Sequence, residues 1–402
     1  MNRTTAVDPP SRVHVAGVMT AVVGSTSSFA VVLAGLTAVG ASPGQAASGL
    51  AILCLLQGLG TAFLAQRHRL PVVLAWSTPG AALLAAGGTV AGGWPAAVGA
   101  FALTGLLLLA TGAIPALGGA VARIPAAIAQ AMLAGVLLPL CLAPVRALVA
   151  EPALVAPVVL VWVAALALRP RLAAPLAIGV ALVVALLTAD GVGTLPQLLP
   201  HLEWTTPGLS WPAVVGIALP LWIVTMAAQN VPGAAVLGSF GYRVPWRSSL
   251  TVTGVATVLG APFGGHALNL AAITAALSAG PEGGADTTRR WLAARTAGLS
   301  YLVIAVFSTA LTALVLHAPG DLLLAAAGLA LVGTLGASLG AAASSPTGRE
   351  AAVVTFVVAV SGVTLAGIGA AFWALLAGLA VHAAVELTRP GRERRAGSAA
   401  AA

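Results

Sequence analysis

The side chains of this 402-residue chain that could bind or protonate a ligand gather in two interrupted apolar segments. The first, residues 76–80, reads WSTPG, and the second, residues 262–269, reads PFGGHALN. Hydroxyls, an imidazole and the free N–H groups at a helix start can hold an anion or exchange a proton. Neither segment contains an Arg, so an anion bound there would be held mainly by backbone donors and by hydroxyls such as those of Ser77 and Thr78.

The first segment predicts a short extended stretch followed by a half-helix. Thr78 suits an N-cap and Pro79 suits the first helical position, where its fixed φ is already helical. The residue before a proline, in contrast, resists the helical conformation. A helix from Pro79 to about Gly87 is too short to cross about 30 Å of hydrocarbon at about 1.5 Å per residue.

The second segment predicts another break of the same kind, with a short extended stretch and a half-helix. Pro262 and the pair Gly264-Gly265 end any preceding helix, and we expect a new half-helix from His266 to about Ala279. His266 is the candidate proton carrier, because the ordinary pKa of histidine, about 6.5, lets it change charge near neutrality. A purely structural role is the alternative. A helix start disfavours imidazolium, so a bound anion would be needed to favour the charged form.

Other polar side chains at membrane depth are few. Gln229 and Asn230 precede a Val-Pro-Gly stretch that loosens a helix, and their amides suit hydrogen bonds to a substrate or between helices. Asn269 follows the second break, and residues 24–28 (GSTSS) form a small polar run at the matching place in the first half. No carboxylate lies in mid-span, and no Walker A, HExxH or GxSxG motif occurs. We therefore expect neither an enzyme nor a cofactor.

The composition requires a membrane. Hydrophobic residues make up 59% of the chain and charged residues 7%, and the mean hydropathy is +1.03, whereas a soluble domain has about 25% charged residues. The basic residues are all Arg and stand in short gaps between apolar runs, so the net charge of +8 indicates membrane topology rather than nucleic-acid binding. Cys54 and Cys141 lie in apolar runs without metal-ligand spacing, so we expect no metal site.

The apolar runs predict a polytopic all-α membrane protein with about fourteen transmembrane segments. With the N-terminus in the cytoplasm, seventeen of the eighteen Arg lie on the cytoplasmic side and only Arg146 lies outside. This places both termini in the cytoplasm of a bacterial inner membrane. Seven segments precede residues 190–211 and seven follow, so the halves are predicted to be inverted repeats with the interrupted segment third in each. The expected spans are 14–39, 46–65, 70–90, 96–116, 124–144, 152–168, 172–189, 211–234, 247–261, 263–279, 291–316, 321–341, 350–367 and 369–387.

Around these residues the chain resembles the benzoate/proton symporter (BenE) family, and the resemblance covers most of its length. It implies import of benzoate or a related aromatic carboxylate with a proton, and a distant similarity to the uracil and nucleobase–ascorbate carriers. In those carriers acidic residues occupy spans eight and ten, where this chain has Gln229 and His266, so their proton mechanism does not transfer directly. The matching stretches are residues 76–80, 226–233, 261–275, 279–282 and 289–291.

The resemblance also implies the domain organisation. A core domain, made of spans 1–4 and 8–11, would move against a gate domain, made of spans 5–7 and 12–14. The expected boundaries are a cytoplasmic tail at 1–13, core at 14–120, gate at 121–190, a periplasmic linker at 191–210, core at 211–317, gate at 318–388 and a cytoplasmic tail at 389–402.

The sequence therefore predicts an alternating-access symporter for a small aromatic carboxylate. The carboxylate would lie between the two half-helix starts, near residues 78–80 and 265–266, with His266 coupling the proton. A carrier for another small anion or a nucleobase, and a passive anion channel, are the alternatives. The expected partners are the substrate, protons and membrane lipid, without nucleic acid, and a homodimer is left open. The predicted substrate-binding residues are Ser77, Thr78, Pro79, Gly80, Gln229, Asn230, Gly264, Gly265, His266 and Asn269.

Overall fold

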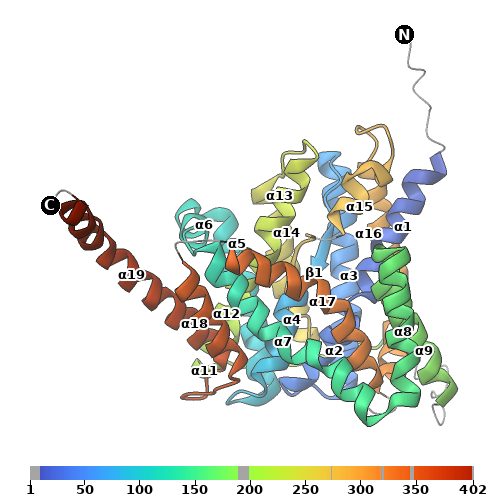
Figure 1. The fold of residues 1–402 in the computed structure, drawn as a ribbon. Helices are drawn as coiled ribbons and strands as arrows, with labels where there is room; N and C mark the ends of the chain where they lie inside the picture. Colours follow the sequence, from blue (N-terminus) through green and yellow to red (C-terminus); the bar gives the residue numbers. More distant parts are fainter. Residues whose placement is uncertain are drawn as a thin grey trace.

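The computed structural model describes residues 10–188, 199–272, 274–316, 318, 321–344 and 348–400. This part of the chain is almost entirely helical, with two short strands near its centre (Figure 1). The first half contains α1 (Pro10–Thr26), α2 (Phe29–Ala38), α3 (Pro43–His68), β1 (Leu74–Trp76), α4 (Thr78–Gly87), α5 (Gly93–Ala113), α6 (Pro115–Ala122), α7 (Ala126–Ala150), α8 (Pro152–Leu168), η1 (Pro170–Leu172) and α9 (Ala173–Thr188). The second half contains α11 (Trp211–Ala213), η2 (Val214–Ala218), α12 (Leu219–Thr225), η3 (Met226–Asn230), α13 (Val231–Ser239), α14 (Trp246–Gly260), η4 (Ala261–Phe263), β2 (Leu268–Leu270), α15 (Ala275–Ala279), η5 (Pro281–Gly283), α16 (Trp291–Leu316), α17 (Leu322–Ala343), α18 (Arg349–Val360) and α19 (Ala370–Ala400).

The helices confirm an all-α membrane protein. Within the described ranges, three apolar helices of 10–17 residues, Pro152–Leu168, Ala173–Thr188 and Ala370–Glu386, accompany seven longer stretches. The total of fourteen spans stays a prediction. The seven stretches long and apolar enough to cross a membrane are Ser11–Ala38, Pro43–His68, Gly93–Ala113, Ala126–Ala150, Trp211–Ser239, Trp291–Val315 and Leu322–Ala343.

The two interrupted segments meet as an antiparallel pair of strands. Two further backbone hydrogen bonds, one on each side, extend the ladder. Lipid offers no hydrogen-bond partners, so leaving a backbone N–H or C=O group unpaired at membrane depth costs several kcal/mol. Here the backbone groups of each interrupted segment pair with those of the other. The paired residues are Leu74 with Leu270, Ala75 with Asn269 and Trp76 with Leu268.

The first interrupted segment has the predicted form, shifted by one residue. The helix α4 begins at Thr78 rather than Pro79, and its N-cap is Ser77, whose hydroxyl oxygen accepts the Gly80 N–H at 3.1 Å. It ends at Gly87, as expected. The strand–half-helix architecture of this segment is therefore confirmed.

The second interrupted segment also has the predicted extended stretch followed by a half-helix, but the expected helix start at His266 is wrong. The strand β2 occupies residues 268–270, and α15 begins only at Ala275. Gly264 turns the chain with a φ of +91°, a value that glycine adopts without strain. The residues after it run extended because the backbone of β1 needs a partner at this depth, and that pairing prevails over local helix preference.

The helix packing repeats between the two halves. α3 packs on α16 through Gly58 and Gly298, and α5 packs on α14 through Gly105 and Gly254. A Cβ on any of these four glycines would lie 2.7 to 2.9 Å from backbone atoms of the facing helix, so glycine is what lets these helices approach so closely. In the predicted numbering, the first contact joins spans two and eleven, and the second joins spans nine and four. A repeat of seven spans relates span two to span nine and span eleven to span four, so the two contacts are equivalent. The inverted repeat is confirmed.

Two groups of helices result from this packing. The first helix group contains α1, α3, α5, α14 and α16, together with the strands and α4. The second helix group contains α7, α8, α9, α17 and α18, with α7 packed on α17 and α18, and α8 on α9. The expected boundaries of the core and gate domains stay a prediction.

Candidate substrate site

A cavity of about 220 Å³ lies where the interrupted segments face the second helix group. α1, β1, α4 and η3 form one side of its wall, and α7, η1, α9 and α17 form the other. Its volume corresponds to about seven waters at about 30 Å³ each and lies below the about 300–1,000 Å³ of drug-sized pockets, so it suits a small ligand. The polar side chains on this central cavity are Ser27, Ser28, Thr78, Gln229, Thr274 and Thr334.

The first turn of α4 borders the central cavity. Thr78 and Pro79 line the wall, while Ser77 caps the helix from behind. Proline has no N–H and the Gly80 N–H is bonded to Ser77, so the Thr78 N–H and hydroxyl are the first-turn donors left for a ligand. A helix start favours an anion by about 0.3–1 kcal/mol when exposed and up to about 2 kcal/mol when partly buried.

An indole forms part of the same wall. Trp76 lines the cavity, and its Nε1–H donates to the Ser28 hydroxyl oxygen at 2.8 Å. This hydrogen bond ties β1 to the end of α1 and holds the indole in place. The wall therefore offers an aromatic surface next to the start of α4, which is an arrangement that fits a ligand with a ring and an anionic group.

Three of the ten predicted binding residues line the central cavity, namely Thr78, Pro79 and Gln229. The carboxylate position predicted between two half-helix starts does not hold on the second side, because residues 265–266 precede a strand rather than a helix. The remaining predicted residues are all buried behind the wall: Ser77, Gly80, Asn230, Gly264, Gly265, His266 and Asn269.

His266 and Asn230 support the wall from behind. The Nε2–H of His266 donates to the backbone carbonyl of Ser77 at 3.0 Å, since a carbonyl can only accept, and the imidazole lies edge-on to Phe101 with 6.4 Å between ring centroids. The Oδ1 of Asn230 accepts the Leu270 N–H at 2.9 Å. His266 therefore contacts the residue that caps α4, and Asn230 holds β2.

The neighbours Gln229 and Asn230 are expected to give opposite phenotypes. Both lie in the π-helical turn η3, but only Gln229 lines the cavity. Gln229→Leu is expected to weaken ligand binding in the cavity up to about tenfold, the upper effect of losing one ordinary hydrogen bond, with an unchanged Tm. Asn230→Leu leaves the Leu270 N–H unpaired at about 1–3 kcal/mol and is expected to lower the Tm. A loss of Tm in the Gln229 variant with none in the Asn230 variant would refute this assignment.

The sequence did not reveal Thr274 and Thr334 as cavity residues. Thr274 stands directly before α15, and the wrong helix start concealed its position. Thr334 is a hydroxyl residue within the apolar α17, and nothing in its neighbourhood along the chain marks it. It reaches the site only because α17 packs across from β1.

The central cavity carries no formal charge in the described part of the chain. Its lining includes no Asp, Glu, Arg or His side chain, and the described residues contain no cluster of three metal-ligating side chains. What the site offers is hydroxyls, one amide, a helix start and apolar surface. That set can bind a small molecule with an apolar body and hydrogen-bond acceptors.

An all-helical inverted repeat, with interrupted segments paired near its centre and a cavity beside them, defines a membrane transporter. The BenE family model, described as "Benzoate membrane transport protein", matches residues 7–384. The chain belongs to this family, which confirms the predicted resemblance and the expectation that the protein is not an enzyme.

Two related proteins and one solved structure show how far the similarity extends. The chain is 37% identical to the inner membrane protein YdcO of Escherichia coli (strain K12) over 94% of this chain and 96% of that protein. It is 29% identical to the benzoate membrane transport protein of Acinetobacter baylyi (strain ATCC 33305 / BD413 / ADP1) over 80% and 81%. The transmembrane domain of the cyanobacterial bicarbonate transporter BicA matches with a TM-score of 0.55 at 17% identity, covering 90% of this chain and 97% of that one, which concerns the fold alone.

Proposed function

We propose that this protein imports benzoate or a related aromatic carboxylate together with a proton, by alternating access across a bacterial inner membrane. The observation that carries the proposal is the central cavity. Its volume is about 220 Å³, and its wall brings together an indole, apolar side chains and the start of α4. Family membership and the 29% identical benzoate transport protein support the substrate class. The 37% identical inner membrane protein supports the location.

Binding in the central cavity would rest on short-range contacts. The carboxylate accepts hydrogen bonds from the N–H and hydroxyl of Thr78 and from the amide of Gln229. The ring packs against Trp76 and Leu137, both of which line the cavity, and aromatic pairs add about 0.5–1.5 kcal/mol beyond burial. Because no guanidinium holds the anion here, it is bound without a permanent ion pair, which favours release.

Alternating access would use the two helix groups as moving parts. The central cavity lies between them, and Val23 and Pro170 line both this cavity and a larger one toward the start of α1. In the proposed orientation α1 starts in the cytoplasm, as the Arg distribution indicates. The larger cavity would then lie on the cytoplasmic side of the central one, which supports a form open toward the cytoplasm.

His266 is the proposed proton carrier. Its Nε2–H is engaged with the Ser77 carbonyl, so a proton would add at Nδ1, which has no hydrogen-bond partner among the described residues. The imidazolium would then lie one hydrogen bond from the residue that caps α4. Positive charge at this point and a bound carboxylate favour each other, which would couple protonation to substrate binding.

Uptake of labelled benzoate into proteoliposomes tests the function. We expect an inward pH gradient to stimulate the protein-dependent initial rate, up to about tenfold per pH unit for one coupled proton. Protein-free liposomes are the control, since neutral benzoic acid crosses bilayers itself. An initial rate that ignores the gradient would contradict symport. Flux that never exceeds the substrate's own gradient indicates a channel, and competition by a nucleobase or bicarbonate but not by aromatic acids would assign a different substrate.

A further inference from the structure

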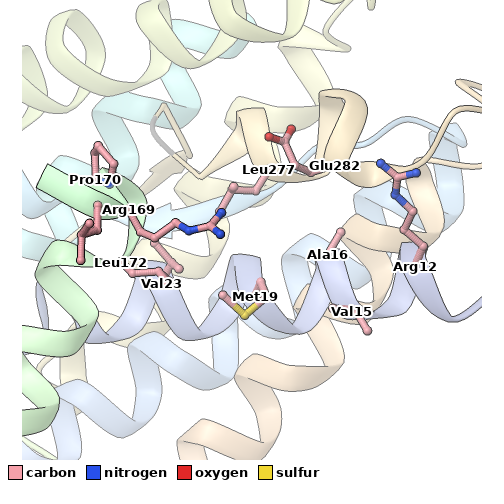
Figure 2. Close-up of a pocket in the computed structure, with 11 residues that line it drawn as sticks. Arg12, Val15, Ala16, Met19, Val23, Arg169, Pro170, Leu172, Leu277 and Glu282 are labelled. Atoms are coloured by element: carbon pink, nitrogen blue, oxygen red, sulfur yellow. The ribbon is translucent and has the colours of Figure 1, made fainter. Parts of the chain in front are cut away.

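A second, larger cavity lies beside the central one, toward the start of α1. Its volume is about 600 Å³, and it shares Val23 and Pro170 with the central cavity. A ligand that leaves the centre on this side passes through this second cavity, which we call the vestibule. Its wall is apolar except at Arg12, Arg169 and Glu282 (Figure 2).

Arg169 lines the vestibule next to a residue that both cavities share. It lies between α8 and η1, directly before the shared Pro170. Its N–H donates to Ala165 at 2.7 Å and its carbonyl accepts the Leu172 N–H at 2.8 Å, so the backbone holds the residue on both sides. Figure 2 shows its side chain extending from this turn toward Leu277. The guanidinium has no hydrogen-bond or ion-pair partner within the described residues.

The wall around Arg169 fits an anion with an apolar body. Val15, Met19 and Leu277 line the vestibule, so a ring can pack there while a charged group faces the guanidinium. Arginine pairs with carboxylates in a planar, two-point geometry, and a cleft with low-dielectric walls concentrates its field. An inorganic anion would gain from the charge alone and nothing from the apolar side chains.

We propose that Arg169 forms an exit subsite for the transported aromatic carboxylate. The guanidinium pairs with the carboxylate after it leaves Thr78 and Gln229, and the ring packs against Met19 and Leu277. This subsite rests on the proposed function. Glu282 also lines the vestibule, and its negative charge disfavours a bound anion, so the subsite holds its ligand weakly and releases it to the water beyond.

Protection of an introduced thiol tests the subsite in the full chain. In a background of Cys54→Ala and Cys141→Ala, Met19→Cys puts a thiol on the vestibule wall. Inside-out membrane vesicles receive a membrane-impermeant thiol reagent with increasing benzoate, which is expected to slow labelling. Arg169→Gln is expected to raise the half-protecting benzoate concentration about fivefold, the upper value for one exposed ion pair. Arg169→Lys keeps the charge but loses the two-point geometry, so it is expected to raise this concentration by about twofold, less than Arg169→Gln does.

Matched controls show whether protection of the thiol arises from binding at Arg169 or from binding in the central cavity. Arg243→Gln removes an exposed arginine between α13 and α14, outside the vestibule, and is expected to change nothing. Gln229→Leu weakens the central cavity and is expected to leave protection of the vestibule thiol intact. The subsite is overturned if benzoate protects the thiol equally well in the Arg169→Gln variant and in the wild type. It is also overturned if Gln229→Leu weakens the protection, or if neutral benzyl alcohol protects the thiol as well as benzoate does. If the wild type neither transports benzoate nor is protected by it, the proposed function fails together with the subsite.

Discussion

Gly24→Ala is expected to lower the rate of substrate uptake at least about tenfold, and adding Tyr301→Phe is expected to restore most of it. Gly24 lines the central cavity, and a Cβ there would overlap the hydroxyl oxygen of the fully buried Tyr301. Overpacking costs about 1–3 kcal/mol, and moving α1 to relieve it would reshape the cavity. Without the hydroxyl, the nearest atoms are Thr274 Cγ2 at 3.4 Å and Tyr301 Cζ at 3.6 Å, which are ordinary contacts.

Two variants control this rescue. Tyr301→Phe alone removes only the hydroxyl and is expected to transport near the wild-type rate. Gly179→Ala adds the same methyl group to α9 at an exposed position with nothing within 4 Å, and we expect no effect. Maximal uptake rate and Tm are measured for all four proteins. A double variant no better than Gly24→Ala would show that the hydroxyl contact is not the cause.

Replacing His266 is expected to remove the response of uptake to a pH gradient, a change of up to about tenfold per unit for one coupled proton. His266→Gln is the informative variant, because its amide can still donate to the Ser77 carbonyl but accepts no proton near neutrality. We expect this variant to exchange internal for external substrate near the wild-type rate, with an initial rate that no longer depends on the gradient.

His266→Ala separates coupling from packing. It empties a buried site beside Phe101 and leaves the Ser77 carbonyl without the imidazole, so we expect a lower Tm in addition to lost coupling. Gradient dependence, exchange rate and Tm are measured for both variants. If the Gln variant still responds fully to the pH gradient, His266 is not the proton carrier.

Local chemistry made the first interrupted segment predictable. Proline and a preceding hydroxyl residue determine where a helix can start through contacts within a few residues, so the error was one residue, from Thr78 to Ser77 as the cap. The same reasoning failed after Gly264. There the conformation depends on pairing with β1, which is far away in the chain. A local sequence pattern carries no information about that partner.

The cavity wall shows the same division between local and distant causes. Gln229 could be selected because an amide is unusual at membrane depth, but its difference from Asn230 depends on the π turn and on where β2 lies. Thr334 could not be selected, because its role arises from the packing of α17 across the molecule.

The pairing of β1 with β2 also bears on how the protein is made. Residues 74–76 leave the ribosome and enter the bilayer long before residues 268–270 exist, so during synthesis the first strand has no partner for its backbone groups. Leaving them bare in hydrocarbon costs several kcal/mol, and closing so long a loop is slow. The strand pair can therefore form only after much of the second half has been made, and an isolated amino-terminal half would leave the backbone groups of β1 without this partner.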